Sequence, residues 1–378
     1  MVTLTNGRLW FYQNFHDGYN MKKIDLYIIK KFLGTFFFSI ILIMVIVVVF
    51  DVAEQIDDFI ETNATFWEIV SGYYMNFIPY FANLFTPLFV FISVIFFTSK
   101  LAQNTEVIAI LSSGISFRRL LFPYFLAATV IVILSLFMAN YFIPNANKEL
   151  FAFKKQYIWN KASNYERNIH KQISPGVLIY MESYSTDFDI GYRFSLEKIE
   201  DNRLVSKLTC DMIQWDSTKS KWTIKNYYIR DIYDDHEVIT KGATIDTTLA
   251  LKPDDFKERM ELIEAMNYFE LNTYIDDQVL RGSPNIEKYE IEKYKRLANP
   301  FSIFILSLIG VCVSSRKVRG GTGLHIGVGL VLSFSYILFL QMSTNFAISG
   351  AMPALLGVWL PNIIYAIIGI GMYKYTPK

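Results

Sequence analysis

Six stretches of the chain are apolar enough, and long enough or nearly so, to cross a lipid bilayer as helices, which need about 20 apolar residues. They are residues 32–50, 69–97, 120–143, 299–315, 324–349 and 353–373. The second contains Pro79 and Pro87, which predict a kinked or tilted helix. The fourth is short and is expected to continue a preceding amphipathic helix, with Pro300 near the junction. The pattern predicts an α-helical membrane protein with six transmembrane helices.

Between the third and fourth stretches, residues 144–298 have the pattern of a water-exposed domain. Apolar and polar residues alternate with the period of a β-strand in three segments, 176–184, 207–215 and 221–232. Many short strands with polar turns predict an all-β domain inserted between helices 3 and 4. Periodicity alone leaves a sandwich, a jelly roll and an open barrel as alternatives. The segment 258–298 is helical in pattern instead.

Basic residues flank the apolar stretches on one side. They are Lys22, Lys23, Lys30, Lys31, Lys100, Arg118, Arg119, Arg316, Lys317, Arg319, Lys374 and Lys378. The segment after the first stretch is interpreted as a loop that holds acids and no base, namely Asp51, Glu54, Asp57, Asp58, Glu61 and Glu68. Because basic loops stay cytoplasmic, both termini are expected inside and residues 144–298 outside.

The N-terminal 20 residues lack an apolar core, so they do not read as a cleaved signal peptide. We interpret residues 1–20 as an extension, with Met21 as an alternative start. Residues 21–143 then hold helices 1–3, and residues 299–378 hold helices 4–6.

Composition agrees with a membrane protein and excludes several other classes. The 378 residues are 52% hydrophobic and 16% aromatic, and the net charge of +1 comes without a basic stripe that could bind nucleic acid. The two cysteines and four histidines show no metal-ligand spacing. The cluster Asp-Asp-His-Glu at 234–237 is tempting as a metal or catalytic site, but an acid-rich turn explains it more simply. No nucleophile motif such as GxSxG is present, so we expect no catalytic residue and no metal.

The chain also lacks an energy source of its own. The six stretches have no Asp, Glu, Lys or Arg away from their ends, whereas ion-coupled transporters place such residues inside the bilayer. The dipeptide Gly-Lys of a phosphate-binding loop does not occur, so no nucleotide site is predicted. Any uphill movement must be driven by a partner.

The segment 104–123, NTEVIAILSSGISFRRLLFP, predicts a short cytoplasmic helix between helices 2 and 3. Asn104 or Thr105 is expected to cap it, Gly114 to end it and Ser116 to cap the next helix. Val107, Ile110 and Leu111 would supply an apolar face. Such a helix either docks in a groove of a partner ATPase or rests on lipid.

This segment resembles the coupling segment of the LptF/LptG permeases of the lipopolysaccharide export system. The matching residues are Glu106, Ala109, Ser113, Gly114, Ser116, Arg119 and Pro123. The resemblance continues through residues 141–149, 213–224, 270–300 and 359–365, in the family's order and spacing.

The resemblance implies a non-catalytic permease subunit of an inner-membrane ABC transporter that exports lipopolysaccharide. Its partners would be a sister LptF/LptG subunit, an LptB-like ATPase dimer that binds ATP and Mg²⁺, and an LptC-like periplasmic bridge. This chain would bind no cofactor itself. The outward domain would be a β-jellyroll.

The resemblance also assigns roles to residues. The coupling helix, residues 104–114, and its flank would use Glu106, Val107, Ala109, Ile110, Ser113, Gly114, Arg118 and Arg119. The first and fifth helices would form gates, with Phe36, Ile40, Val47, Phe50, Gly327, Phe334 and Gln341 as candidates. In the outward domain, Val177, Ile179, Trp222 and Ile224 are either the core of a sheet or the lining of a lipid path.

The outer end of the first helix departs from the family pattern. Some members carry lysines there that meet lipid phosphates, but here residues 47–61 hold five acids and no base. Carboxylates would repel phosphate unless divalent cations bridge them, so a phosphate clamp is not expected at this place. A receptor or assembly scaffold with an outward β domain remains the alternative to a permease.

Overall fold

The computed structural model describes residues 21–158, 165–185, 188–249, 251–253, 260–280, 283, 286–316 and 321–376. The expected N-terminal extension, residues 1–20, lies outside them. Two compact units make up the structure, and each is described by itself. The helical unit takes in the chain up to Asp57, Tyr74–Ala146 and the chain from Glu290 onward. The second unit consists of Asp58–Tyr73 and Asn147–Tyr289.

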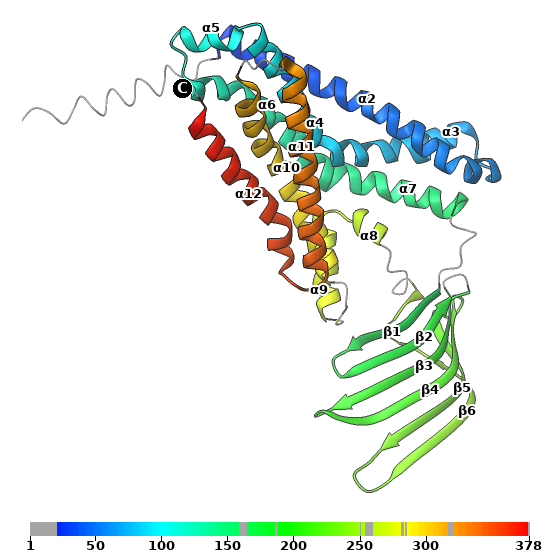
Figure 1. Ribbon diagram of the computed structural model, residues 1–378. Coiled ribbons are helices and arrows are strands. Elements are labelled where there is room, and N and C mark those ends of the chain that lie inside the picture. The colour runs from blue at the N-terminus through cyan, green and yellow to red at the C-terminus, as the bar shows by residue number, and fades with distance from the viewer. Residues whose placement is uncertain are drawn as a thin grey trace, which may run out of the picture. The chain divides into compact units, whose positions relative to one another are not determined.

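The structure confirms the six predicted apolar helices among the described residues (Figure 1). They are centred on α2 (Lys23–Glu61), α4 (Met75–Gln103), α6 (Phe117–Phe137), α10 (Ile286–Ser314), α11 (Gly321–Ile348) and α12 (Ala354–Tyr375). A separate antiparallel sheet of six strands follows the third of these helices in the chain and precedes the fourth. This order fits the predicted insertion.

Several helices continue well beyond their apolar stretches. α2 has 39 residues, which at 1.5 Å per residue is about 58 Å, whereas the hydrocarbon core is about 30 Å thick. The acids from Asp51 to Glu61 lie on the last turns of α2, so the expectation of a loop there is wrong. α10 begins at Ile286 and runs through Pro300, which confirms the expected helical extension before the fourth stretch.

Two of the spanning segments are completed by short π-helices. α3 (Phe66–Glu68) and η1 (Ile69–Tyr74) lead into α4, while η2 (Met138–Phe142) and α7 (Ile143–Tyr157) continue α6. α3 begins with a capping box, in which Thr65 and Glu68 each bond the other's backbone. A π-turn has one more residue than an α-turn, so it rotates the side chains that follow.

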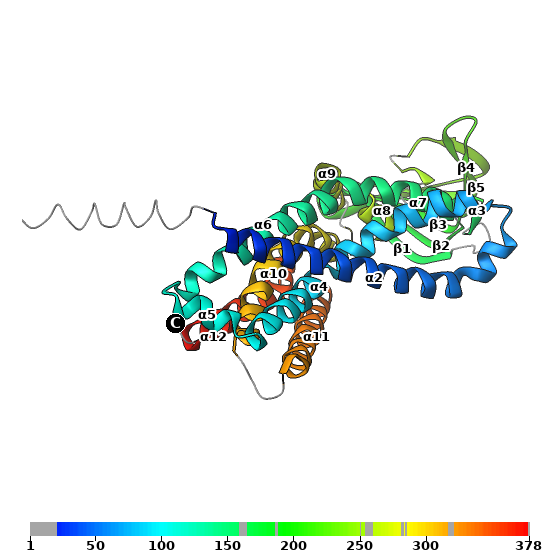
Figure 2. The same cartoon turned by 90° about the horizontal axis from the view of Figure 1, so that it is seen from above.

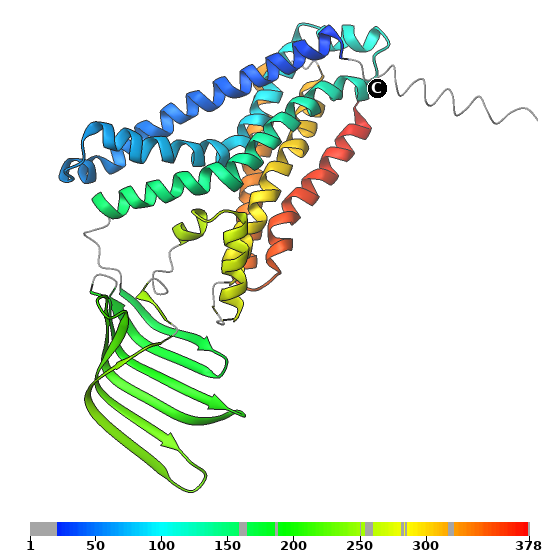
Figure 3. The same ribbon diagram turned by 180° about the vertical axis from the view of Figure 1, so that it is seen from behind.

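The core of the helical unit lies where several helices meet, at the ends that are predicted to face the cytoplasm. Phe32 of α2, Phe97 of α4 and Tyr124 of α6 are buried together, and the Thr98 hydroxyl donates to the Tyr124 oxygen at 2.9 Å. The start of α2, the end of α12 and α5 (Glu106–Ser112) lie at one end of this unit in both side views (Figures 1 and 3). Figure 2 shows the unit from above, with α5 beside the end of α12.

The described strands form a single antiparallel meander, in which each strand pairs with the next one along the chain. The strands are β1 (Tyr165–Ser174), β2 (Val177–Ser185), β3 (Ile190–Glu200), β4 (Arg203–Asp216), β5 (Lys221–Ile232) and β6 (Glu237–Thr247). The expected hairpin between β4 and β5 is present, and the Asp216 carboxylate accepts backbone N–H groups of Thr218 and Lys219 there. Asp234 and Asp235 form the turn before β6, as expected.

Neighbouring strands share an irregularity at the same position along their length, here called the crease. On β2, β4 and β5, core-facing residues are two apart along most of the strand but three apart at Met181–Tyr184, Cys210–Ile213 and Ile224–Tyr227. Asn168, Arg193 and Asn226, on alternate strands, have positive φ angles at this level. The strand pairing keeps the same register on both sides of this level, so the core face continues across the crease.

The core of the sheet is closed by the chain that follows β6. Trp222 is fully buried, and its indole N–H donates to the Leu251 carbonyl at 2.8 Å. Cys210 lies in the same cluster, and burial raises the pKa of its thiol to about 12. Further along the chain are α8 (Met260–Glu264) and α9 (Tyr268–Leu280), in which Leu271 and Ile275 are buried.

Gly176 tests the packing at the β1–β2 turn. Its φ of +76° disfavours other residues, and an added Cβ would lie 2.5 Å from the Ile199 carbonyl oxygen. We expect Gly176→Ala to lower the free energy of unfolding of the sheet by about 1–3 kcal/mol. Labelling of Cys210 in urea, in a Cys312→Ser background, reports this opening because the buried thiol reacts only once the sheet unfolds. Ser217→Ala in an exposed hairpin is the control, and equal urea midpoints for both variants would contradict the prediction.

Candidate functional site

The short helix between the second and third spans is present as α5 (Glu106–Ser112). It starts from Thr105, whose φ of 61° is left-handed and whose side chain does not cap the helix. The expected cap is therefore wrong. Asn104 instead donates its amide to the Glu106 carboxylate at 3.1 Å. Gly114, with a φ of 86°, follows the helix as predicted.

The next helix is capped as the sequence predicts. The Ser116 hydroxyl accepts the backbone N–H of Arg119 at 3.3 Å, at the first turn of α6. The whole segment from Glu106 to Arg119 is therefore a helix, a glycine-bounded turn and a second capped helix. Such a short connection leaves α5 little freedom to move independently of α6.

The two faces of α5 have opposite environments. Val107 is 1% exposed and belongs to the core of the helical unit, and Ile110 and Leu111 are half-buried against that core. The apolar face predicted from the sequence thus holds α5 to its own chain. The surface left open on the other side consists of Ile108, Ala109, Ser112 and Ser113. Of the residues expected to meet a partner, Ala109 and Ser113 lie on this open face.

The two arginines that follow α5 also differ in their exposure. Arg118 is exposed. Arg119 forms a bidentate ion pair with Asp25 of α2, with Nη1–Oδ1 and Nη2–Oδ2 distances of 2.8 and 2.6 Å. Sequence reasoning did not find Asp25. The available signal was a lone acid among the four lysines of residues 22–31.

α2 and α11 have the smallest buried fraction among the six candidate spans. In their most apolar windows, 17% and 22% of residues are buried, against 33–61% in the other four helices. Among the gate candidates, Phe50, Gly327, Phe334 and Gln341 are exposed, whereas Ile40 and Val47 are half-buried. Phe36 is 3% exposed and belongs to the helical core, so it does not lie on an open face.

Polar side chains inside the helical unit join helices to one another. Asn362 of α12 donates to the Ala298 carbonyl at 2.9 Å and accepts from the Tyr336 hydroxyl at 2.8 Å. Asn83 of α4 accepts from Ser135 of α6 at 2.6 Å. Hydrogen bonds of this kind hold membrane-spanning helices together.

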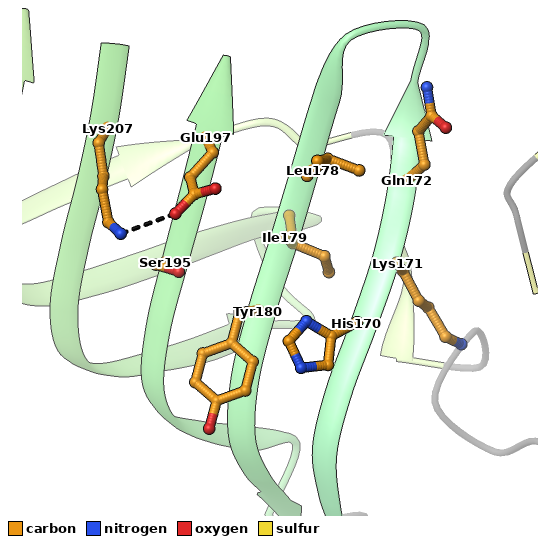
Figure 4. A pocket seen from close by; sticks show the side chains of 9 residues that line it. All are labelled: His170, Lys171, Gln172, Leu178, Ile179, Tyr180, Ser195, Glu197 and Lys207. Carbon is orange, nitrogen blue, oxygen red and sulfur yellow. Dashed lines mark ion pairs between the residues drawn. The ribbon is translucent and has the colours of Figure 1, made fainter. Parts of the chain in front are cut away.

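The candidate lipid-path residues of the sheet are mostly core. Ile179, Trp222 and Ile224 are 0–2% exposed, and Val177 is half-buried. An open hollow of about 430 Å³ lies over β1–β4, and Ile179 is among the residues that line it (Figure 4). Its lining combines apolar surface with polar groups, among them His170, Tyr180 and the ion pair between Glu197 and Lys207, 2.7 Å apart.

No group of metal-ligating side chains is present in the part of the chain that the structure describes. No three His, Cys, Asp or Glu side chains gather there in a way that could hold a metal ion. His236 of the 234–237 cluster contacts the neighbouring Asp235 at 2.6 Å, and both are exposed in the turn.

Six apolar helices with a separate antiparallel sheet define a multi-pass membrane protein with an extramembrane β domain. The family described as "Lipopolysaccharide export system permease LptF/LptG" matches residues 26–375. The chain therefore belongs to the LptF/LptG family, whose members are transmembrane permeases for lipopolysaccharide transport in the inner membrane. No curated protein matches the chain significantly.

Single cysteines on α5 test the orientation of this helix. We expect Ile108→Cys and Ala109→Cys to react quickly with a membrane-impermeant thiol reagent in permeabilised membranes. Val107→Cys, whose side chain is buried, should react slowly because reagent and base cannot reach it. Equal rates at positions 107 and 108 would contradict the two-faced environment of α5.

Proposed function

We propose that this chain is one of two permease subunits of an ABC transporter that extracts lipopolysaccharide from the inner membrane. The partner subunit is a sister LptF/LptG chain, and a separate LptB-like ATPase dimer supplies the energy. The lipid then passes through the periplasmic sheet domain to an LptC-like bridge. The chain itself is non-catalytic and binds no cofactor, because ATP and Mg²⁺ belong to the ATPase.

The observation that carries this proposal is the two-faced environment of α5. A helix of seven residues does not persist alone in water, yet α5 is held by the burial of Val107. Its opposite face offers Ile108 and Ala109 to a partner, with Glu106 at the first turn for a partner's basic residue. A firmly seated helix with a free outer face suits transmission of force from an ATPase.

The proposal places α5 in the cytoplasm and the sheet in the periplasm, with both termini inside. Support comes from the charge pattern. The start of α2, the start of α6 and the end of α12 lie at the end of the helical unit that carries α5 (Figure 1), and they hold Lys23, Arg118 and Lys374.

The exposure of α2 and α11 supports their role as the gate helices. Apolar helix faces that the chain leaves open must be covered by lipid or by another helix. A sister subunit contributing its own first and fifth helices would enclose a lipid-sized space between two such pairs. Phe50 and Phe334, at 73% and 57% exposure, are candidates to line it.

The proposed lipid path through the sheet depends on its form. We propose that the creased meander is the β-jellyroll-like domain of the family. Its core residues, Ile179, Trp222 and Ile224, would have to part for acyl chains to enter between them. The acids of the last turns of α2 are not expected to clamp phosphate, so either the lipid is less phosphorylated or the bases that meet its phosphates come from the sister subunit.

Ile108→Glu tests the docking of α5. Co-purification with an LptB-like ATPase in mild detergent should fall by roughly 10-fold, because the carboxylate would be desolvated in an apolar groove. Phe188→Glu, an equally severe change at a 68% exposed side chain between β2 and β3, should leave recovery unchanged. If the folded wild-type chain brings down no ATPase, the permease proposal fails and the scaffold alternative takes its place.

A photo-crosslinking amino acid tests the gate. At Phe334, which is exposed on α11, it should capture lipopolysaccharide or the sister subunit in intact membranes. At Tyr336, two residues along the same helix but 4% exposed, it should capture neither. Crosslinking from both positions, or from neither, would contradict the assignment of the open face of α11 to the lipid path.

A further inference from the structure

The ion pair between Asp25 and Arg119 connects two helix starts that are 94 residues apart in the chain. Asp25 lies in the first turn of α2, and its carboxylate also accepts the backbone N–H of Lys22 at 2.7 Å. Arg119 lies in the first turn of α6, where Ser116 fixes its backbone. Each side chain is thus anchored in the rigid first turn of its helix.

The pair is buried unusually well for a charged contact near the end of a helical bundle. The Asp25 side chain is 1% exposed and the Arg119 side chain 18%. Both guanidinium nitrogens face carboxylate oxygens, which is the fork-to-fork geometry that only arginine provides. Loss of either partner would leave an uncompensated charge in a desolvated place.

The same place is where α5 meets α2. A small cavity between them is lined by Ile28 and Asp25 of α2, Ile110 of α5, and Arg119 and Leu120 of α6. Val107 belongs to the same buried cluster as Ile28. The start of α2, the helix α5 and the start of α6 therefore form one contiguous contact.

Apolar packing alone would hold these three elements together without fixing how they are oriented. The hydrophobic effect is non-directional, so close packing resists separation of the helices without providing a polar contact of defined direction. A bidentate ion pair has a defined direction and register, and it cannot be shifted without breaking two charge-assisted hydrogen bonds. The pair thus fixes the orientation of the start of α2 against the start of α6, to which α5 is joined by the short turn that ends at Ser116.

We propose that Asp25 and Arg119 are positioning residues that transmit movement of α5 to α2, the first gate helix. The proposal rests on the proposed function, because it takes α5 as the ATPase-docking helix and α2 as a gate. Arg119 then acts through its contact with Asp25 within this chain, whereas the open face of α5 binds the ATPase. When the ATPase displaces α5, the ion pair carries the start of α2 with it.

The test compares stability with coupling in the reconstituted complex with its ATPase and sister subunit. Asp25→Ala/Arg119→Ala removes both charges, so no buried charge is left unpaired and the complex should assemble and hydrolyse ATP. Lipopolysaccharide released per ATP should nevertheless fall by roughly 5-fold or more, as expected when a coupling contact is lost. Lys30→Gln, which removes an exposed charge on α2, is the matched control and should release lipid as the wild type does.

A covalent link provides a rescue that a merely structural role would not show. In Asp25→Cys/Arg119→Cys, a short bifunctional thiol reagent should restore lipid release per ATP, and a monofunctional reagent of similar size should not. The wild type treated with either reagent controls for Cys210 and Cys312, which are both buried.

The outcomes separate the two proposals. Wild-type lipid release per ATP in the alanine double variant, or no rescue by the covalent link, would overturn the role of the ion pair and leave the permease function intact. A wild-type complex that hydrolyses ATP without releasing lipid would overturn the proposed function itself. If the alanine variant does not assemble, the cysteine variant with and without its link decides the question.

Discussion

Hydrocarbon offers no hydrogen-bond partner, so a spanning helix must satisfy its polar groups within the protein. Several hydroxyl groups of the helical unit bond to carbonyls one turn back, as Thr129 does with Phe125 at 2.8 Å. Amides reach across to other helices instead, as Asn362 does to Ala298. These bonds occupy polar groups that an ion-coupled transporter would need for its cargo. The spans are therefore suited to moving as packed blocks, under a force applied from outside the bilayer.

The same constraint explains why α2 and α11 can be left uncovered. Lipid tails are as apolar as leucine, so an exposed apolar helix face costs nothing in a bilayer, although it would in water. Close packing in a membrane must then come from small residues that admit a neighbour. Gly329 of α11 lies directly against Ile95 of α4, whereas Gly323 and Gly327 have open space around the place of a Cβ. One part of α11 is thus fixed to its own chain, and another part is free for a different partner.

The sequence predicted those parts of the structure that depend on composition along the chain. Apolar windows located six spans, and alternation located β2, β4 and β5.

The helical ends of α2 were missed because acids such as Asp51 and Asp57 mark solvent, and solvent exposure is compatible with both helix and loop. The crease was missed because a strict period of two does not anticipate a step of three residues, such as that from Met181 to Tyr184. The face of α5 was misjudged because an apolar stripe does not say whether it packs on its own chain or on a partner. The Asp25–Arg119 contact joins residues far apart in the chain, which local patterns do not relate.

The seven residues of α5 have a physical consequence for how force enters the chain. Because so short a helix is unstable in isolation, its folded form depends on Val107 and on the turn that ends at Ser116. A partner that binds the open face of α5 therefore binds the folded bundle end as a whole. The free energy of binding at this face therefore acts on every helix that contributes to the same buried cluster. Ile28 of α2 and Phe117 of α6 belong to that cluster. Displacement of α5 relative to α2 would first have to break the core that folds α5, so moving the two together is the lower-energy response.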